Sequence, residues 1–426
     1  MTLSRLLYTT ILYLLSPFIV LRLLYRALKS PAYAKRWAER FGWYGSPDTS
    51  NVIWLHAVSV GETLAAAPLI KALQKSYPDS RLMVTCMTTT GSERIQSLFG
   101  DSIEHSYAPY DMPHAVAGFL KAFRPRVLII METELWPNTI AACAKRNIPV
   151  ILANARLSEK SAGGYAKMAS LVRPMLQSIT AVAAQHQDDG ARFARLGLRD
   201  QSLSISGNIK FDLHLDEDVR AQAKKLGMAW RGAKQRPVWL VASTHKGEDE
   251  IVLQAFAKIV AAMAIPPLLI LVPRHPERFN QVAELCAHAG FRVARRSANQ
   301  PSEQADILLG DTMGELMSFF GACDFAFVGG SLVPNGGHNM IEPAAWGVPI
   351  LSGPHLFNFS EVSRLLVDGK AMRLCDSADS LAAECIEIMQ NQQLATEMGS
   401  AARRIAEANR GALKRLLKVI DNSLQG

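Results

Sequence analysis

The sequence lacks the features that mark disulfide-bonded, metal-binding or nucleic-acid-binding proteins. Its six cysteines include no CxxC pair, which predicts buried free thiols in a reducing compartment. No long block of lysine and arginine occurs, and no basic motif is interleaved with aromatic residues, which argues against an RNA or DNA partner. The histidines show no ligand spacing, and no Asp-x-Asp follows a strand-like run, so neither a metal ion nor another cofactor is expected.

The length and charge of the chain narrow its class further. A chain of 426 residues is too long for one ordinary core, so two domains are expected. The formal net charge of +8 is mild for this length. Such a charge fits an anionic membrane surface or phosphorylated ligands.

The first 30 residues predict a membrane anchor. The run Leu6–Leu21 holds no charged residue, basic residues follow it, and only Arg5 precedes it. A cleaved signal peptide would carry its basic residues first, and the positive charge after the run places the body of the protein in the cytoplasm. The run is slightly shorter than the ~20 residues of a spanning helix. A short signal-anchor helix and a helix lying in the cytoplasmic leaflet both remain open, with a buried core helix as the third alternative.

After Asn51 the chain alternates short runs rich in valine and isoleucine with amphipathic helical patterns, which is typical of βαβ units and a parallel sheet. A polar stretch with helical character separates two such series. The sequence therefore predicts an α/β chain with an anchor helix over 1–30, doubly wound domains over 31–207 and 237–426, and a linker over 208–236. We expect the two domains to face a cleft and the second to end in helices.

Two acidic sites are expected in loops that follow strands of the first domain, where ligands bind in such sheets. In HAVSVGET, Gly61 permits a tight turn and Glu62 stands at a helix N-terminus. The helix dipole should lower the pKa of Glu62, which would keep it ionised and able to take a proton from an alcohol; a stabilising contact with the dipole is the structural alternative. In METELWPN, Glu132 and Glu134 would share one face of an extended chain, unless they cap a helix or pair with a nearby arginine.

Two segments of the second domain are candidates for binding an anion. Arg274 and His275 end the strand-like run LLILVPRH, and an arginine can hold phosphate or carboxylate oxygens with both arms of its guanidinium. GDTMGEL has the Thr312-x-x-Glu315 spacing of a capping box. The exposed amides of that first helical turn suit an anion or a nucleobase edge, although a cap alone needs no ligand.

The glycine-rich segment FVGGSLVPNGGHNMIEPAAWG joins a strand to a helix. Its glycines allow the backbone to approach a ligand closely. Asn339 is expected as the N-cap, with Glu342 at the third helical position. The helix N-terminus would attract a phosphate, which leaves Glu342 free to accept hydrogen bonds from paired hydroxyls such as those of a ribose.

Seven motifs, in order, extend the pattern over nearly the whole chain: SVGE, METELWPN, PRHPERF, GDTMGEL, FVGGSLV, GGHN–EPA and GPH–FNF. Together they resemble the 3-deoxy-D-manno-oct-2-ulosonic acid (Kdo) transferases. The resemblance implies a GT-B glycosyltransferase with two Rossmann-like domains. It also implies inverting transfer of Kdo from CMP-Kdo to a lipid A precursor (lipid IVA) in lipopolysaccharide biosynthesis, at the cytoplasmic face of the inner membrane and without a metal ion.

The resemblance further implies roles for single residues. Glu62 resembles the general base that deprotonates the acceptor hydroxyl, and Glu132 and Glu134 resemble an acidic cluster on the acceptor side. The implied CMP-binding residues are Pro273, Arg274, Met313, Gly314, Glu315, Asn339, Met340, Ile341 and Glu342. The chain departs from the family pattern at Met340-Ile341, where Pro-Leu is expected, and at Pro334-Asn335, where a basic residue is common.

The expected partners are CMP-Kdo, the lipid A precursor and the inner-membrane lipid surface, with no nucleic acid. Three alternatives remain. The first is another membrane-associated GT-B enzyme that uses a UDP-sugar. The second is a soluble sugar-nucleotide epimerase of the same two-domain plan, against which the apolar N-terminus argues. The third is a non-catalytic lipid-binding or scaffold protein at the membrane, in which Glu62 and Arg274 would be dispensable.

Overall fold

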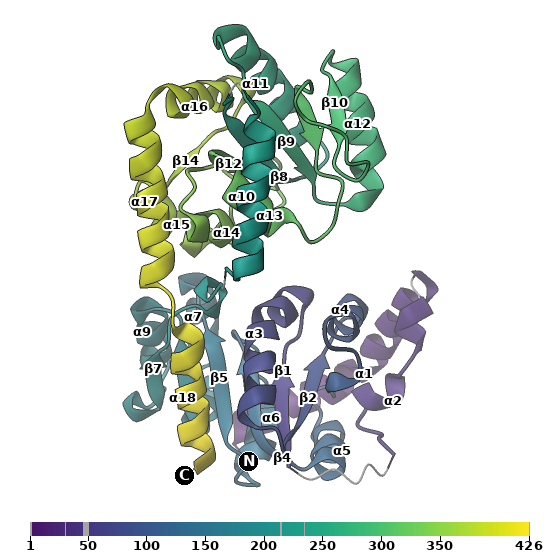
Figure 1. Cartoon of the computed structure of the whole chain (residues 1–426). Helices are drawn as coiled ribbons and strands as arrows, with labels where there is room; N and C mark the ends of the chain where they lie inside the picture. Colours follow the sequence, from purple (N-terminus) through teal and green to yellow (C-terminus); the bar gives the residue numbers. More distant parts are fainter. Residues whose placement is uncertain (1, 30, 46–50, 214, 234, 426) are drawn as a thin grey trace. The chain divides into compact units, whose positions relative to one another are not determined.

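The computed structural model describes residues 2–29, 31–45, 51–213, 215–233 and 235–425. Met1 and Ser30, the ends of the predicted anchor segment, lie outside the described residues. The chain divides into two compact units (Figure 1): Met1–Asp212 with Arg410–Gly426, and Leu213–Asn409. The sequence-based ranges differ from these units, because most of the expected linker belongs to the second unit and the last helix belongs to the first.

The first unit contains, within the described residues, a parallel sheet of seven strands in the order β3-β2-β1-β4-β5-β6-β7. Both faces of the central strands are buried, which explains their continuous apolar runs. Trp54 and Leu128 point into one core, and Leu55 and Ile129 point into the core on the opposite face. The strands are β1 Val52–His56, β2 Arg81–Cys86, β3 Glu104–Tyr107, β4 Pro125–Met131, β5 Val150–Ala155, β6 Ala181–Ala184 and β7 Leu203–Ile205.

Helices connect these strands, and their starts follow local rules. The Ser59 side chain caps α3 by accepting a hydrogen bond from the Glu62 amide. Pro113 and Pro137 occupy the first positions of α5 and α6, where a missing N–H costs nothing. The helices are α1 Leu3–Lys29, α2 Trp37–Arg40, α3 Val60–Ser76, α4 Thr89–Phe99, α5 Pro113–Phe123, α6 Pro137–Ala144, α7 Glu159–Ala166, α8 Ala169–Gln177, α9 Gln187–Arg195 and α18 Ala412–Gln425.

The second unit repeats this plan, with seven parallel strands among its described residues in the order β10-β11-β9-β8-β12-β13-β14. The strands are β8 Val238–Thr244, β9 Leu268–Pro273, β10 Val293–Arg295, β11 Ile307–Leu309, β12 Phe325–Val328, β13 Ile350–Ser352 and β14 Met372–Leu374. The helices are α10 Glu217–Arg231, α11 Glu248–Ala262, α12 Phe279–His288, α13 Leu316–Ala322, α14 Ile341–Trp346, α15 Ser360–Asp368, α16 Ala378–Gln390 and α17 Gln392–Ala408. The prediction of two doubly wound α/β domains is confirmed.

The C-terminal helix α18 packs on the first unit, beside α3, β5 and β6 (Figure 1, yellow). Ala412, Leu416 and Ile420 are fully buried in the core face that also holds Leu55. The Asp212 carboxylate accepts hydrogen bonds from two amides at the start of this segment. The six cysteines are buried and unpaired, as the sequence predicts.

One side of helix α1 exposes apolar side chains, and the other side forms hydrogen bonds with the rest of the first unit. Among the described residues, it is the one helix long and apolar enough to cross a membrane, over Leu3–Leu28. It contacts α6 and α8. The Thr9 and Asn138 side chains are both buried and hydrogen-bond each other at 3.0 and 3.1 Å. The Tyr8 hydroxyl donates to Asp111 at 3.1 Å.

Candidate functional site

The Glu62 carboxylate lies in the first turn of α3, directly after strand β1, and is 9% exposed. Its Oε2 accepts a hydrogen bond from the Val58 amide at 2.8 Å, and its Oε1 accepts one from the Ser59 hydroxyl at 3.0 Å. These two bonds leave lone pairs on both oxygens. Gly61 lies inside the helix rather than in the tight turn that the sequence suggested.

The expectation that the helix dipole lowers the pKa of Glu62 is wrong. This pKa is raised from 4.5 to about 7. Burial is the largest cause, the charges of Glu134 and Glu132 add to it, and the two hydrogen bonds oppose it. A carboxylate with a pKa near neutrality is matched to accept a proton at neutral pH. Strands β1 and β4 are neighbours, so the structure places Glu62, Glu132 and Glu134 at one edge of this sheet.

Glu132 and Glu134 do not share one face of an extended chain, because strand β4 ends at Met131 and Glu132 adopts a left-handed conformation (φ 55°). Non-glycine residues at positive φ store strain that clusters at functional sites. Buried Glu132 forms ion pairs with Arg156 at 2.8 Å and with Lys210 at 3.5 Å. Glu132 therefore pairs with an arginine, which is one of the alternatives considered for this motif.

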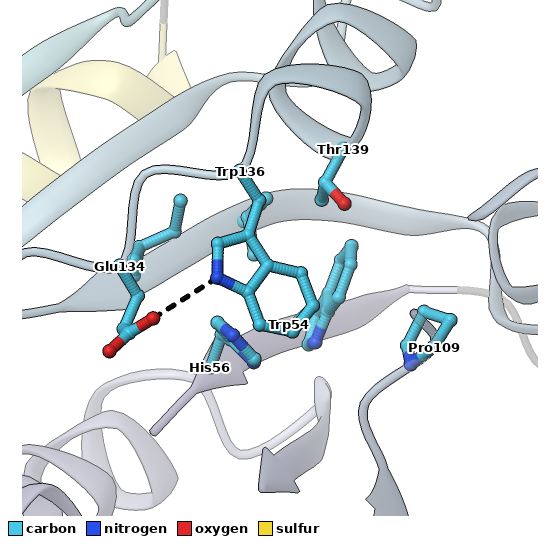
Figure 2. Close-up of a pocket in the computed structure, with 8 residues that line it drawn as sticks. Trp54, His56, Pro109, Glu134, Trp136 and Thr139 are labelled. Carbon is cyan, nitrogen blue, oxygen red and sulfur yellow. Dashed lines mark hydrogen bonds between the residues drawn. The ribbon is translucent and has the colours of Figure 1, made fainter. Parts of the chain in front are cut away.

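Glu134 is half-buried and accepts a hydrogen bond from the Trp136 indole at 3.1 Å. The Trp136 ring lies edge-on to His56, with 4.7 Å between ring centroids. Burial lowers the pKa of His56 to about 4, so this ring is neutral, and its Nδ1 lies 2.9 Å from the Thr85 hydroxyl. Figure 2 shows the rings gathered at a small pocket lined, among the described residues, by Trp54, His56, Pro109, Leu128, Ile130, Glu134, Trp136 and Thr139.

In the second unit, the segments after β9 and β12 bring Arg274 and Glu342 to one edge of the sheet. Arg274 is exposed directly after Pro273. Burial raises the pKa of Glu342, opposed by a hydrogen bond from the Asn339 amide group at 3.1 Å and by the charge of Arg274. The expected N-cap is displaced by one residue, since Met340 precedes the helix, yet the Asn339 side chain still accepts from the Ile341 amide at 3.1 Å. The Met340 and Ile341 side chains are fully buried in the core, so only their backbone is available to a ligand.

The segment after β11 differs from the predicted capping box. Glu315 itself precedes α13, and its carboxylate accepts from the Thr312 hydroxyl at 2.5 Å and from Arg296 at 2.7 Å. Burial acts to raise the pKa of Glu315, but these hydrogen bonds outweigh it and lower the pKa. Met313 is exposed and Gly314 has a φ of 85°. Helices α13 and α14 contact each other, so this segment belongs to the same side of the unit as Glu342.

His245 was not predicted as a site residue, although its position directly after strand β8 is a signal that could have identified it. Its Nε2 lies 2.8 Å from the Nε2 of His338, and the two rings are nearly parallel. Burial and the charge of Arg274 lower the pKa of His338 to about 4. One neutral ring therefore donates to the other. In the described part of the chain, no group of three His, Cys, Asp or Glu side chains is arranged to hold a metal ion.

Comparison with known proteins gives consistent matches. Residues 35–213 match the family "3-Deoxy-D-manno-octulosonic-acid transferase (kdotransferase)". The 3-deoxy-D-manno-octulosonic acid transferase of Haemophilus influenzae is 42% identical over 425 residues, covering 99% of this chain and 99% of that protein. The protein of the same name from Bordetella pertussis is 37% identical over 432 residues, covering 98% and 99%.

Solved structures confirm the expected fold. A putative UDP-N-acetylglucosamine 2-epimerase from Listeria monocytogenes has a TM-score of 0.57 at 13% identity, covering 88% of this chain and 97% of that one. A glycosyltransferase from Rickettsia africae has a TM-score of 0.55 at 14% identity, covering 89% and 100%. At such identities the likeness concerns the GT-B fold alone. The full-length matches at 42% and 37% identity show the family as well as the fold. This chain therefore belongs to the Kdo transferase family.

Proposed function

We propose that this chain transfers Kdo from CMP-Kdo to a lipid A precursor, lipid IVA, in lipopolysaccharide biosynthesis. The observation that carries the proposal is the Glu62 carboxylate. It is buried, its pKa is raised to about 7, and the acidic side chains of Glu132 and Glu134 act on it. The chain that carries it belongs to the Kdo transferase family.

Glu62 is the general base of the proposed reaction. The acceptor hydroxyl attacks the anomeric carbon of Kdo and gives its proton to a Glu62 oxygen, while the bond between that carbon and the phosphate oxygen of CMP breaks. CMP leaves as a phosphate monoester. One displacement of this kind inverts the configuration at the anomeric carbon.

The second unit holds the donor in this proposal. Arg274 neutralises the phosphate of CMP, and Glu342 accepts hydrogen bonds from the ribose hydroxyls. Pro273, Met313–Glu315 and the backbone of Asn339–Ile341 complete the nucleotide site. Because the arginine and backbone amides balance the charge of the departing phosphate, we propose that the reaction needs no metal ion or other cofactor.

The acceptor is assigned to the first unit. Glu132 and Glu134 form the acidic part of that site. The exposed side chain of Arg156, which pairs with Glu132, supplies a positive charge there for an anionic glycolipid. This role for Arg156 follows from charge alone.

A transfer assay tests the proposal. The full-length chain is incubated with CMP-Kdo and a tetraacylated lipid A precursor, and mass spectrometry reads the lipid. We expect products heavier than the precursor by one or more whole Kdo residues. A chain that instead glycosylates the lipid from a UDP-sugar would support the alternative GT-B activity.

We also propose that α1 holds the protein on the cytoplasmic face of the inner membrane by lying in the lipid surface. One side of the helix is committed to the first unit through buried Thr9 and half-buried Tyr8. The opposite side exposes Leu7, Leu14 and Leu21 by 60, 70 and 60%. The first half of α1 is held along its side by the folded unit. This contact favours a helix lying flat in the lipid surface over a helix that spans the membrane.

Spin labels on single cysteines at Leu7, Leu14 and Leu21 test this arrangement in lipid vesicles. A flat helix puts all three labels at the same shallow depth. A spanning helix rises 1.5 Å per residue, so successive labels would differ in depth by about 10 Å. A label at the exposed position Ser400 of α17 is the aqueous control. A steady gradient of depth along α1 would contradict the flat arrangement.

A further inference from the structure

Glu248, in the first turn of α11, has a fully buried carboxylate in the second unit. Among the described residues it accepts four backbone hydrogen bonds. Oε2 accepts from the His245 amide at 2.8 Å and from the Gly330 amide at 2.7 Å. Oε1 accepts from the Ser331 and Leu332 amides, both at 2.9 Å. All four distances are those of strong charge-assisted hydrogen bonds.

The four amides belong to two loops that are distant in sequence. His245 follows strand β8, and Gly330–Leu332 follow strand β12, which is the neighbour of β8 in the sheet. Both loops leave the carboxyl edge of the sheet, where ligands bind in this fold. One carboxylate therefore ties the ends of two adjacent strands together at that edge.

The glycines of this loop fit the carboxylate. Gly330 has a φ of 70°, which lets successive amides turn toward one anion. A Cβ at Gly329 would lie 2.8 Å from the Ser243 carbonyl oxygen and 3.0 Å from Oε2 of Glu248. These close approaches leave no room for a side chain. The contact with Glu248 inside the protein thus explains the glycine pair without any contact to a ligand.

The tied loops carry the candidate donor residues. His245 reaches His338 through the contact at 2.8 Å. The Gly337 amide donates a hydrogen bond to the Gly330 carbonyl at 2.7 Å. The Ser331 hydroxyl accepts from the Gly353 amide at 2.8 Å. The loop over residues 330–332 donates its amides to Glu248. The positions of His338, Asn339 and Glu342 therefore depend on this loop.

We propose that Glu248 is a positioning residue for the donor site: its carboxylate holds the loops after β8 and β12 in the conformation that binds CMP. The inference rests on the proposed function for the identity of the nucleotide. The four amides donate hydrogen bonds to both oxygens of the Glu248 carboxylate. This buried negative charge can therefore lie beneath a site for a negatively charged donor. A glutamine in its place would offer one acceptor oxygen and turn two N–H donors toward backbone N–H groups.

Calorimetric titration of CMP into the full-length protein in detergent tests the proposal. Glu248→Gln should weaken CMP binding by roughly tenfold or more, because only a fraction of the loops would keep the binding conformation. Glu248→Asp, which keeps the charge on a shorter side chain, should lie between this variant and the wild type. Glu250→Gln, at an exposed position of the same helix turn, should bind CMP as the wild type does. In transfer assays the KM for the donor should rise in Glu248→Gln while the KM for the lipid acceptor stays constant.

The outcomes separate this inference from the proposed function. A wild-type protein that does not bind CMP contradicts the proposed function itself. A wild type that binds CMP, together with a folded Glu248→Gln that binds it equally well, overturns the positioning role. Where the glutamine variant does not fold, hydrogen exchange on the wild type without nucleotide decides. The proposal predicts protected amides at His245 and Gly330–Leu332, and rapid exchange there overturns it.

Discussion

Glu62→Gln is expected to lower turnover by roughly 10²–10⁴-fold with little change in CMP affinity. The glutamine has nearly the same shape, and its oxygen can still accept the hydrogen bond that the Val58 amide now donates. It cannot take a proton from the acceptor hydroxyl. Steady-state rates and CMP titration on the same preparation measure the two effects. Glu159→Gln, at an exposed first-turn position of α7, is the matched control and should leave turnover unchanged.

The pH dependence of turnover gives the same prediction a signature. Since the base must be ionised, wild-type turnover should rise with pH through the pKa of Glu62, about 7. This rise should be absent from the residual activity of the glutamine variant. Unchanged turnover in a folded variant would remove Glu62 as the base.

The same pKa affects the stability of the folded protein. A raised carboxyl pKa stabilises the folded protein below the unfolded pKa of 4.5, and that contribution is lost as the pH rises through about 7. Above neutral pH, Glu62→Gln should therefore unfold no more easily than the wild type.

Arg274→Ala is expected to raise the KM for the donor by roughly 10- to 100-fold, the size of a lost charge-assisted contact to phosphate. The effect should fall on donor binding because Arg274 is exposed at the sheet edge to which the donor is assigned in our proposal, and its charge acts on the pKa values of Glu342 and His338. Initial rates over a range of donor concentrations measure it.

Two variants sharpen the test at Arg274. Arg274→Lys keeps the charge without the planar fork, so it should recover part of the affinity. Arg404→Ala removes an exposed arginine from α17 of the same unit and should have no effect. An unaltered donor KM in Arg274→Ala would count against the assigned role.

Much of the fold and of the candidate site could be predicted from the sequence, because the loops after parallel strands meet at one edge of a sheet. Glu62, Glu132 and Glu134 were placed by this rule, as were Arg274 and Glu342. The alternation of apolar runs does not reveal strands β3, β7 and β10, because these short edge strands lack a long apolar run.

The pKa of Glu62 could not be read from the sequence. The dipole of a helix contributes about 0.3–1 kcal/mol, less than one pKa unit, whereas the pKa of Glu62 is raised from 4.5 to about 7, chiefly by burial. Burial depends on the packing of the whole unit, and the left-handed turn at Glu132 depends on where strand β4 ends. Glu248 was overlooked for a related reason, since three of its four amides lie 82 to 84 positions further along the chain.

The most direct test of the central claim is the transfer assay with CMP-Kdo, run with EDTA and with the donor generated in place. We expect lipid products carrying whole Kdo residues from CMP-Kdo, none from UDP-sugars, and no loss of product with EDTA. With intact donor and well-dispersed lipid, an unmodified precursor would contradict the proposed function and direct the search to another donor or acceptor.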